Sequence, residues 1–375
     1  MRTVVADVRM LAYPLTGIGR YVFELLRRLT PVEETEWVLL SPLPVPPDVR
    51  GAIGGQVRWV EGDGSQKAER WTQRVGAREL RSHPGALFVG LASSVPLFGP
   101  KSSRYALVIY DLTHVAIPRL THRQDLIKGW LFTWPSVRKA DLLLTISPAI
   151  ERELHAWVPR TRGRTVALPP AGTPLVIPRE PVPFGERRGF LAVGAHPRKN
   201  TPLLVEAYAA LPAEVRERHP LTILSRRFPP GLARTIQRIG PDCHVSLVAD
   251  AADADLANYY ASSLALVYPS VYEGLGLPVA EAMFAGLPSI VAAGSPMAEF
   301  LGDGGIAVAP LTASAVSQAM LRLAGDERLW NDLAAAAQRE ARAISWEAAA
   351  ATAAEALGLG SGAGAASAAG DCQER

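Results

Sequence analysis

Cysteine is scarce in this sequence, which has two, Cys243 and Cys372, among 375 residues. Two cysteines are too few for the disulfide framework of a small secreted domain, so a reducing, cytoplasmic setting is expected. Otherwise the composition is that of an ordinary globular protein, with 48% hydrophobic, 20% charged and 7% aromatic residues. The length allows two domains, each with its own core.

Long hydrophobic runs are also missing. The longest uncharged runs, 256–272 and 282–298, are both interrupted by Pro or Gly. At about 17 residues they are at the lower limit for a transmembrane helix. The N-terminus lacks the apolar region of a signal peptide. We therefore expect neither a membrane span nor a secretory leader.

An excess of charge of one sign is absent overall but present in each half. The formal net charge is +3, yet residues 1–178 carry 23 Lys+Arg against 15 Asp+Glu, a net +8, and the remainder carries 16 against 21, a net −5. Such a split suggests different partners for the two halves. Chance scatter over two solvated surfaces explains it equally well.

Short apolar runs alternate with helical patterns along the whole chain. This alternation predicts an α/β fold with parallel sheets covered on both faces. The expected strands are Thr3–Arg9, Trp37–Ser41, Val57–Glu61, Ala86–Gly90, Tyr105–Leu112, Asp141–Ser147, Gly189–Gly194, Leu221–Ser225, His244–Val248, Leu264–Pro269, Pro288–Ala292 and Ile306–Ala309. The expected helices are Ile18–Leu29, Thr201–Leu211, Asp253–Ala261, Pro278–Ala285 and Asp326–Ala343.

A proline-rich segment, Leu168–Gly189, divides the two halves and is interpreted as a linker. We expect an N-terminal domain at 1–178, a C-terminal domain at 179–343, a last helix at 344–358 and a disordered Gly/Ala/Ser-rich tail at 359–375. Ligands of doubly wound sheets bind beyond the carboxyl ends of the strands, so we look there for a site.

The stretch VYEGLGLPVAEAM (Val271–Met283) places two carboxylates around a glycine-broken loop. Glu273 is expected on the loop after a buried strand, and Glu281 in the first turn of the next helix. Gly274 and Gly276 would let the backbone approach a ligand, and a helix N-terminus suits a phosphate. The carboxylates would accept hydrogen bonds from sugar and ribose hydroxyls. Alternatively, they are a solvated loop residue and a helix-capping charge.

The longer stretch PSVYEGLGLPVAEAMFAGLPSIV resembles the signature of glycosyltransferase family 4. These retaining enzymes have the GT-B fold, in which two Rossmann-like, doubly wound parallel-sheet domains face a central cleft and a C-terminal helix crosses back to the N-terminal domain. Leu275 stands where the family usually has Phe. The resemblance implies that Glu273 contacts the transferred sugar and Glu281 holds the ribose. It also implies that the backbone around Gly276 and Leu277 meets the sugar and diphosphate.

A second match lies in GAHPRKNTPLLVEAY (194–208), which is similar to the family motif after the first strand of the C-terminal domain. The resemblance implies that Lys199 neutralises the donor diphosphate, with Arg198 as a weaker candidate. Some relatives have an arginine where this chain has Ala195, which puts a second phosphate cation there in doubt. The plain alternative is a solvated basic turn at the start of a helix.

The N-terminal half matches through DVRMLAYPLTGIGRYVFELLRRL (Asp7–Leu29), which resembles the family's first strand, glycine loop and first helix. Backbone N–H groups at Gly17 and Gly19 are then expected to reach the donor phosphate, although glycines also simply make turns. ISWEAAAATAAEALG (344–358) resembles the family's crossing helix, or is a plain alanine-rich surface helix.

YDLTHVAIP departs from the family pattern. Relatives usually have a histidine facing the sugar where this chain has Tyr110. Asp111 is retained, as an acceptor-side residue or as a strand-end cap. His114 is a candidate to replace the missing imidazole, or a structural histidine.

The segment Arg119–Lys139 combines five basic residues, one acid and interleaved aromatics. Basic residues with aromatics suggest contact with an anionic membrane or a lipid-phosphate acceptor. A core helix with a solvated basic face is the alternative. Nothing resembles a nucleic-acid reader motif, so we expect no nucleic-acid partner.

Together these features predict a glycosyltransferase that moves a hexose from a nucleotide-diphosphate sugar to a glycan hydroxyl, on a lipid-linked precursor at the inner face of the cytoplasmic membrane. GDP-mannose is favoured as donor, because Gly-Ile-Gly-Arg-Tyr with Pro-Arg-Lys-Asn is similar to bacterial mannosyl- and rhamnosyltransferases of surface polysaccharides. No cofactor or metal is expected, since no Asp-x-Asp motif ends a strand. Lys199 and helix N-termini would replace the metal.

Other function classes fit less well. A sugar-nucleotide 2-epimerase shares the fold but has different motifs. A NAD-dependent oxidoreductase needs a third glycine, which Gly17-Ile18-Gly19 lacks. A non-catalytic protein that binds glycans or nucleotide sugars stays open, because the departures at Tyr110 and Ala195 are compatible with lost activity.

Overall fold

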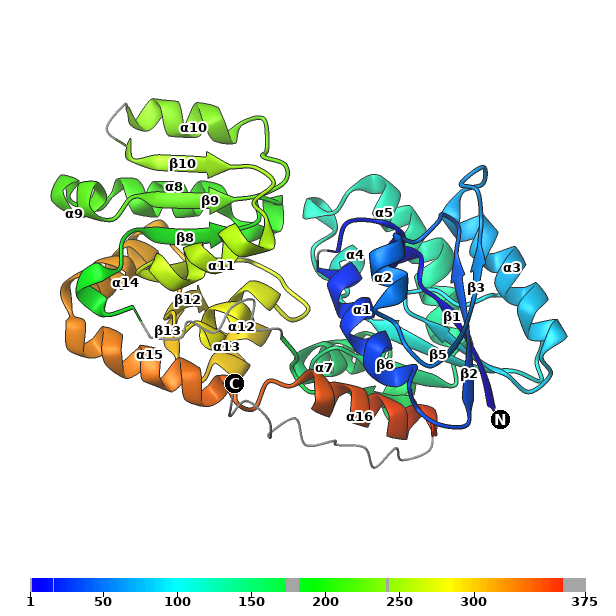
Figure 1. Ribbon diagram of the computed structural model, residues 1–375. Helices are drawn as coiled ribbons and strands as arrows, with labels where there is room; N and C mark the ends of the chain where they lie inside the picture. The colour runs from blue at the N-terminus through cyan, green and yellow to red at the C-terminus, as the bar shows by residue number, and fades with distance from the viewer. Residues whose placement is uncertain (1, 16, 173–181, 241–242, 360–375) are drawn as a thin grey trace, which may run out of the picture. The chain divides into compact units, whose positions relative to one another are not determined.

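The computed structural model describes residues 2–15, 17–172, 182–240 and 243–359 (Figure 1). The expected tail, apart from Leu359, and the middle of the expected linker lie outside these residues. The chain forms two compact units. The first comprises Met1–Leu107, Ser136–Leu142 and Ala350–Arg375, and the second comprises Val108–Pro135 and Leu143–Ala349.

Two sheets, one of seven and one of six strands, dominate the fold (Figure 1). In the seven-stranded sheet the order is β3 (Gln56–Glu61), β2 (Thr35–Ser41), β1 (Arg2–Asp7), β4 (Leu87–Gly90), β5 (Arg104–Ile109), β6 (Leu142–Thr145) and β7 (Thr165–Ala167). Strand β1 is central and parallel to both neighbours, with Val4 opposite Trp37 on one side and Leu87 on the other. The strand order reverses between β1 and β4.

The second sheet repeats the design. Its order is β10 (Val245–Val248), β9 (Leu221–Leu224), β8 (Phe190–Val193), β11 (Ala265–Tyr268), β12 (Ser289–Ala292) and β13 (Gly305–Val308), all joined by parallel pairs. Here the order reverses between β8 and β11, which pair at Leu191 and Leu266. Two doubly wound parallel sheets confirm the predicted fold class.

Helices connect the strands throughout. Those before β8 are α1 (Ile18–Leu29), α2 (Pro47–Gly51), α3 (Ala68–Ser82), α4 (Thr113–Ala116), α5 (Arg123–Lys128), α6 (Trp134–Lys139) and α7 (Pro148–Trp157). Those after β8 are α8 (Thr201–Ala209), α9 (Ala213–Arg218), α10 (Leu232–Ile239), α11 (Asp253–Ser262), α12 (Leu277–Phe284), α13 (Pro296–Leu301), α14 (Ala313–Gly325), α15 (Glu327–Ala341) and α16 (Trp346–Leu357). Short helical turns lie at η1 (Arg9–Ala12), η2 (Pro118–Leu120), η4 (Pro159–Arg164), η5 (Phe184–Glu186) and η6 (Pro197–Lys199).

Apolar layers cover both faces of the six-stranded sheet. On one face, Leu204 of α8 and Met320 of α14 pack with Ile223 of β9. On the other face, Met283 of α12 and Met297 of α13 pack with Tyr268 and other side chains of the sheet. Because both faces are buried, the strands read as continuous apolar runs, which is why they are visible in the sequence.

The last helix, α16, is divided between the two units at Ala350, so the chain returns to the first unit at its end. Within that unit, an Arg2 guanidinium nitrogen donates to the Gly358 carbonyl, which ties the end of α16 to β1. This agrees with the predicted crossing helix. Among the described residues, no helix is both long and apolar enough to cross a membrane.

Strand and helix ends differ from the predictions by a few residues. The segment Arg119–Lys139, for which a core helix was the alternative, is helical from Arg123 to Lys139 and contains a π turn. It is divided into η2, α5, a π-helical turn at Gly129–Thr133 and α6. Pro118 begins η2, Pro135 is the second residue of α6, and the π turn changes the helical periodicity for the residues after it.

Candidate functional site

The candidate site lies where the strand order of the second sheet reverses. Strand β8 leads into the turn that carries Arg198 and Lys199, and the neighbouring strand β11 leads into the loop that carries Glu273. Because the two strands are parallel, their carboxyl ends lie at the same edge of the sheet. This is the position at which open α/β sheets bind ligands.

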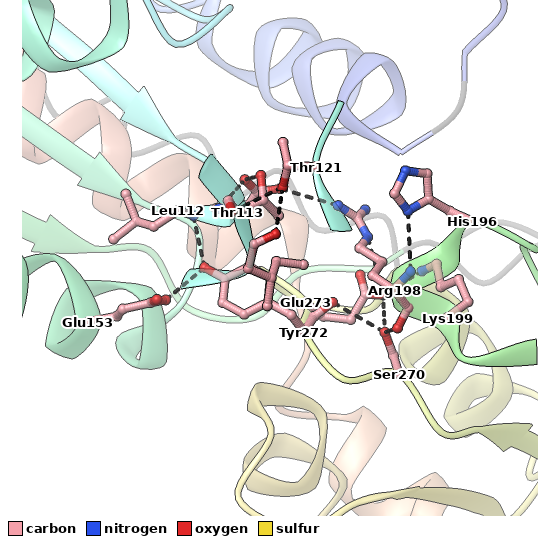
Figure 2. A network of polar contacts seen from close by, with 12 residues as sticks. Leu112, Thr113, Thr121, Glu153, His196, Arg198, Lys199, Ser270, Tyr272 and Glu273 are labelled. Atoms are coloured by element: carbon pink, nitrogen blue, oxygen red, sulfur yellow. Dashed lines mark hydrogen bonds and ion pairs between the residues drawn. The ribbon is translucent and has the colours of Figure 1, made fainter. Parts of the chain in front are cut away.

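Glu273 is the centre of the site (Figure 2). Its side chain is buried, with 5% of the residue exposed. Its Oε1 accepts hydrogen bonds from Lys199 Nζ at 2.6 Å and from Ser270 Oγ at 2.7 Å. Lys199 Nζ also donates to the Tyr268 hydroxyl and lies 4.4 Å from the centre of that ring. The predicted sugar-binding carboxylate and the predicted phosphate-binding cation are therefore direct neighbours.

The charges of this pair influence each other. Burial alone would raise the pKa of Glu273, but the Lys199 ammonium and the Arg198 guanidinium outweigh it and hold that pKa below its ordinary value. Burial lowers the pKa of Lys199, and although Glu273 opposes this shift, Arg198 adds to it. Glu273 is thus an anion at neutral pH, available as a hydrogen-bond acceptor only.

Arg198 stands between two carboxylates. Its Nη1 lies 3.6 Å from Asp111 Oδ2, and its Nε lies 3.7 Å from Glu273 Oε1. These distances are long for hydrogen bonds, and the buried Nε has no hydrogen-bond partner in the described part of the chain. Asp111 is oriented by Thr113, whose N–H and hydroxyl both donate to Oδ1. A second cation therefore joins Lys199 although Ala195 provides none.

The two loop glycines are required for steric and conformational reasons. A Cβ at Gly274 would lie 1.9 Å from the Tyr110 carbonyl oxygen, so a side chain does not fit there. Gly276 has φ +89°, a left-handed conformation, and a Cβ there would meet the Met297 side chain. Gly276 is the N-cap of α12, and Leu277 is its first residue. Contact of this backbone with a sugar or diphosphate stays a prediction.

Glu281 corrects one prediction. Helix α12 begins at Leu277, so Glu281 is its fifth residue and lies in the second turn, not the first. Gly276 turns the chain into the helix one residue earlier than expected. Glu281 is buried and accepts a hydrogen bond from the Tyr260 hydroxyl at 2.7 Å. It therefore does not act as a first-turn charge at the helix N-terminus.

The two predicted phosphate-binding glycines lie at the start of α1, in the first unit. Gly17 is the N-cap of this helix and Gly19 lies in its first turn. A Cβ at Gly19 would be 3.1 Å from the Met10 carbonyl oxygen, so it serves close backbone packing there. Their role toward a donor phosphate stays a prediction.

His114 lies in α4 and is buried. Its ring meets the edge of the Trp134 ring, with centroids 5.4 Å apart, and leaves no room for a side chain at Gly129. Burial lowers the pKa of His114, against the opposing effect of Asp111. The packing favours the structural interpretation that the sequence left open, although no observation tests the catalytic one.

Sequence reasoning missed several residues around the site. Ser270 and Tyr268 flank the glutamate motif, and alternation along β11 and its loop would have placed both side chains near Glu273. Tyr260 gave no local signal, because its partner Glu281 is 21 residues away. In the described part of the chain, no group of three or more His, Cys, Asp or Glu residues is arranged to hold a metal ion. Metal independence stays a prediction.

Comparison with known proteins identifies the class. Residues 187–326 match the model of the family "Glycosyl transferases group 1". O-antigen chain mannosyltransferase B of Escherichia coli is 30% identical over 373 residues, which covers 89% of this chain and 94% of that protein. Serotype-specific mannosyltransferase WbdA of Escherichia coli is 30% identical over 155 residues, or 40% of this chain and 19% of that protein.

Solved structures agree on the fold. Sucrose-phosphate synthase from Thermosynechococcus elongatus has a TM-score of 0.73 at 20% identity, with 95% of this chain and 98% of that one covered. WaaG, a glycosyltransferase involved in lipopolysaccharide biosynthesis, has a TM-score of 0.71 at 15% identity, with 96% and 100% covered. The fold is therefore GT-B. The family match and the 30% identical mannosyltransferase show that the protein is a glycosyltransferase. The chain belongs to the group 1 glycosyltransferases, as its motifs predicted.

Proposed function

We propose that this enzyme transfers mannose from a nucleotide-diphosphate donor, GDP-mannose first among them, to a hydroxyl of a glycan, with retention of configuration. The observation that carries the proposal is the convergence of Lys199, Arg198 and Glu273 at the carboxyl ends of β8 and β11. Two cations suit a diphosphate, and an ionised carboxylate suits sugar hydroxyls. The match to O-antigen chain mannosyltransferase B supports mannose.

The proposed chemistry assigns each group one task. The bond between the sugar C1 and the diphosphate oxygen breaks, and a bond between C1 and the acceptor oxygen forms on the same face. The acceptor proton moves to the leaving phosphate oxygen. Lys199 and Arg198 stabilise the charge that develops on the diphosphate, and Glu273 orients the sugar through its hydroxyls. No step needs a protein nucleophile or a metal ion.

The test is turnover of nucleotide sugars by the purified protein with and without EDTA. The proposal expects mannosylated product and free nucleoside diphosphate in both cases. Loss of activity with EDTA that manganese restores would overturn the metal-independent chemistry. An epimerised nucleotide sugar would indicate a 2-epimerase instead, and binding of a donor without any turnover would indicate a non-catalytic protein.

Lys199→Ala is expected to weaken binding of the nucleoside diphosphate. Loss of a charge-assisted contact costs about 1.5–3 kcal/mol, or roughly 10- to 150-fold in the dissociation constant. Lys101→Ala, which removes an exposed lysine of the first unit, is the matched control and should change nothing. Isothermal titration with the nucleoside diphosphate is the measurement. Equal affinity of Lys199→Ala and wild type would remove Lys199 from the diphosphate site.

We also propose that the acceptor is lipid-linked. The enzyme would then bind the anionic inner face of the cytoplasmic membrane through α5 and the π turn. Ile127 in α5 and Trp130 and Leu131 in the π turn are 57%, 58% and 58% exposed. Exposed Arg123 lies one turn before Ile127. Exposed apolar side chains that include a Trp and have a basic flank fit an anionic lipid surface.

Part of the basic-aromatic segment faces inward and is excluded from this surface. Trp134 is buried against His114. Lys139 Nζ donates to the carbonyl oxygens of Pro96 and Leu97 and lies over the Tyr105 ring, all within the first unit. The proposed membrane surface is therefore narrower than Arg119–Lys139.

Reversing Arg123 and Lys128 to Glu together is expected to reduce binding to anionic vesicles while sparing donor affinity. Each basic residue near such a surface contributes about 1 kcal/mol, so salt should release the wild-type protein as well. Reversal of the exposed Arg234 and Arg238 on α10 is the charge-matched control. Cosedimentation at two salt concentrations is the measurement. If equal amounts of protein cosediment with neutral and anionic vesicles, the segment is only a solvated basic face.

A further inference from the structure

A second set of contacts holds the Glu273 segment from residues outside the charged cluster. The Tyr272 hydroxyl donates to Glu153 Oε2 at 2.7 Å and accepts a hydrogen bond from the Leu112 N–H at 2.8 Å (Figure 2). Glu153 lies in α7, and Leu112 lies between β5 and α4. All of these residues belong to the second unit.

The residue on the other side of Glu273 is fixed as well. Ser147, which caps α7, donates through its hydroxyl to the Gly274 carbonyl at 2.8 Å. The Tyr110 carbonyl oxygen packs so closely on Gly274 that no Cβ fits between them. The chain is therefore held immediately before and immediately after the carboxylate, by α7 and by the segment after β5.

These backbone contacts would matter most with a donor bound, because the groups that hold the Glu273 side chain are the expected diphosphate ligands. Glu273 is held through its own side chain by Lys199, with Arg198 nearby. Both cations are the groups that would turn toward a diphosphate. The carboxylate then keeps the hydrogen bond from Ser270, and its position depends on the backbone on either side.

We propose that Tyr272 is a positioning residue for sugar transfer, and that Glu153 anchors it so that Glu273 stays aligned with the sugar after Lys199 engages the diphosphate. This inference rests on the proposed function, because it concerns the same site. Burial, with Glu153 adding to it, raises the pKa of the Tyr272 phenol above its ordinary value, so the hydroxyl stays a donor. Tyr272 touches no reacting atom and acts through the position of its neighbour.

The test is the steady-state kinetics of Tyr272→Phe, which removes one hydroxyl and keeps the ring. We expect kcat to fall by about tenfold or more, because small displacements of a positioned group are costly, while affinity for the nucleoside diphosphate stays unchanged. Tyr208→Phe is the matched control. It removes a phenol that is hydrogen-bonded to carbonyls in the core of the same unit and should lower thermal stability without lowering kcat.

Two variants of Glu153 keep the proposal testable if Tyr272→Phe fails to fold. Glu153→Gln retains an oxygen that accepts from the phenol and should keep most of kcat. Glu153→Leu removes the acceptor and should lower kcat as Tyr272→Phe does. If Tyr272→Phe and Glu153→Leu both keep the wild-type kcat while Glu273→Gln loses it, Tyr272 is not a positioning residue. The proposed function would still hold in that case. A wild-type enzyme that transfers no sugar would overturn the proposed function together with this inference.

Discussion

Replacing Glu273 with glutamine is expected to lower the rate of sugar transfer on the order of 100-fold, the cost of removing one group that stabilises a transition state. Glutamine keeps the shape and still accepts a hydrogen bond from Ser270, so the loop should hold. The lost negative charge also frees Lys199 from its ion pair. Affinity for the nucleoside diphosphate should therefore stay equal or increase.

Glu281→Gln is the matched comparison, because it removes the same charge from a buried glutamate of the same unit. If Glu281 holds the ribose, this variant should weaken nucleoside-diphosphate binding instead. Calorimetry and single-turnover rates on both variants separate the two effects. The same profile for both would show that the assigned division between sugar and ribose is wrong.

Gly274→Ala is expected to lower both the stability of the protein and the rate of transfer. Its Cβ would lie 1.9 Å from the Tyr110 carbonyl oxygen, so backbone must move, and overpacking of this kind costs about 1–3 kcal/mol. The displacement occurs next to Glu273, so we expect transfer to fall by at least about tenfold as well.

The control for Gly274→Ala is Gly231→Ala. Gly231 lies in the same unit with φ −82°, and nothing lies within 4 Å of a Cβ built there. This control should be neutral or slightly stabilising, because alanine restricts the unfolded chain. Thermal unfolding and transfer rates measure both variants. A Gly274→Ala enzyme with wild-type stability and rate would contradict the close packing of the loop.

The sequence predicted the fold and the centre of the site because both leave local signals. Buried parallel strands produce continuous apolar runs, and α1 begins and ends at the predicted residues, Ile18 and Leu29. Lys199 and Glu273 lie in short motifs at neighbouring strand ends, so topology alone brings them together.

What the sequence could not reveal depends on distant partners. Glu153 and Tyr272 are 119 residues apart, and Ser147 and Gly274 are 127 residues apart, so no local sequence pattern predicts either contact. The π turn at Gly129–Thr133 interrupts helical periodicity, and no local pattern in the sequence predicts it. Glu281 lies in the second turn because the left-handed Gly276 starts α12 at Leu277. The sequence alone does not show that Gly276 adopts this conformation.

We propose that Lys199 and Glu273 form a site that transfers mannose with retention of configuration. The most direct measurement incubates the purified enzyme with GDP-mannose and a mannose-terminated glycan, and determines the anomeric configuration of the product by NMR. We expect an α-linked product from the α-linked donor, and loss of this product in Glu273→Gln. A β-linked product, or no transfer from any nucleotide sugar offered, would contradict it.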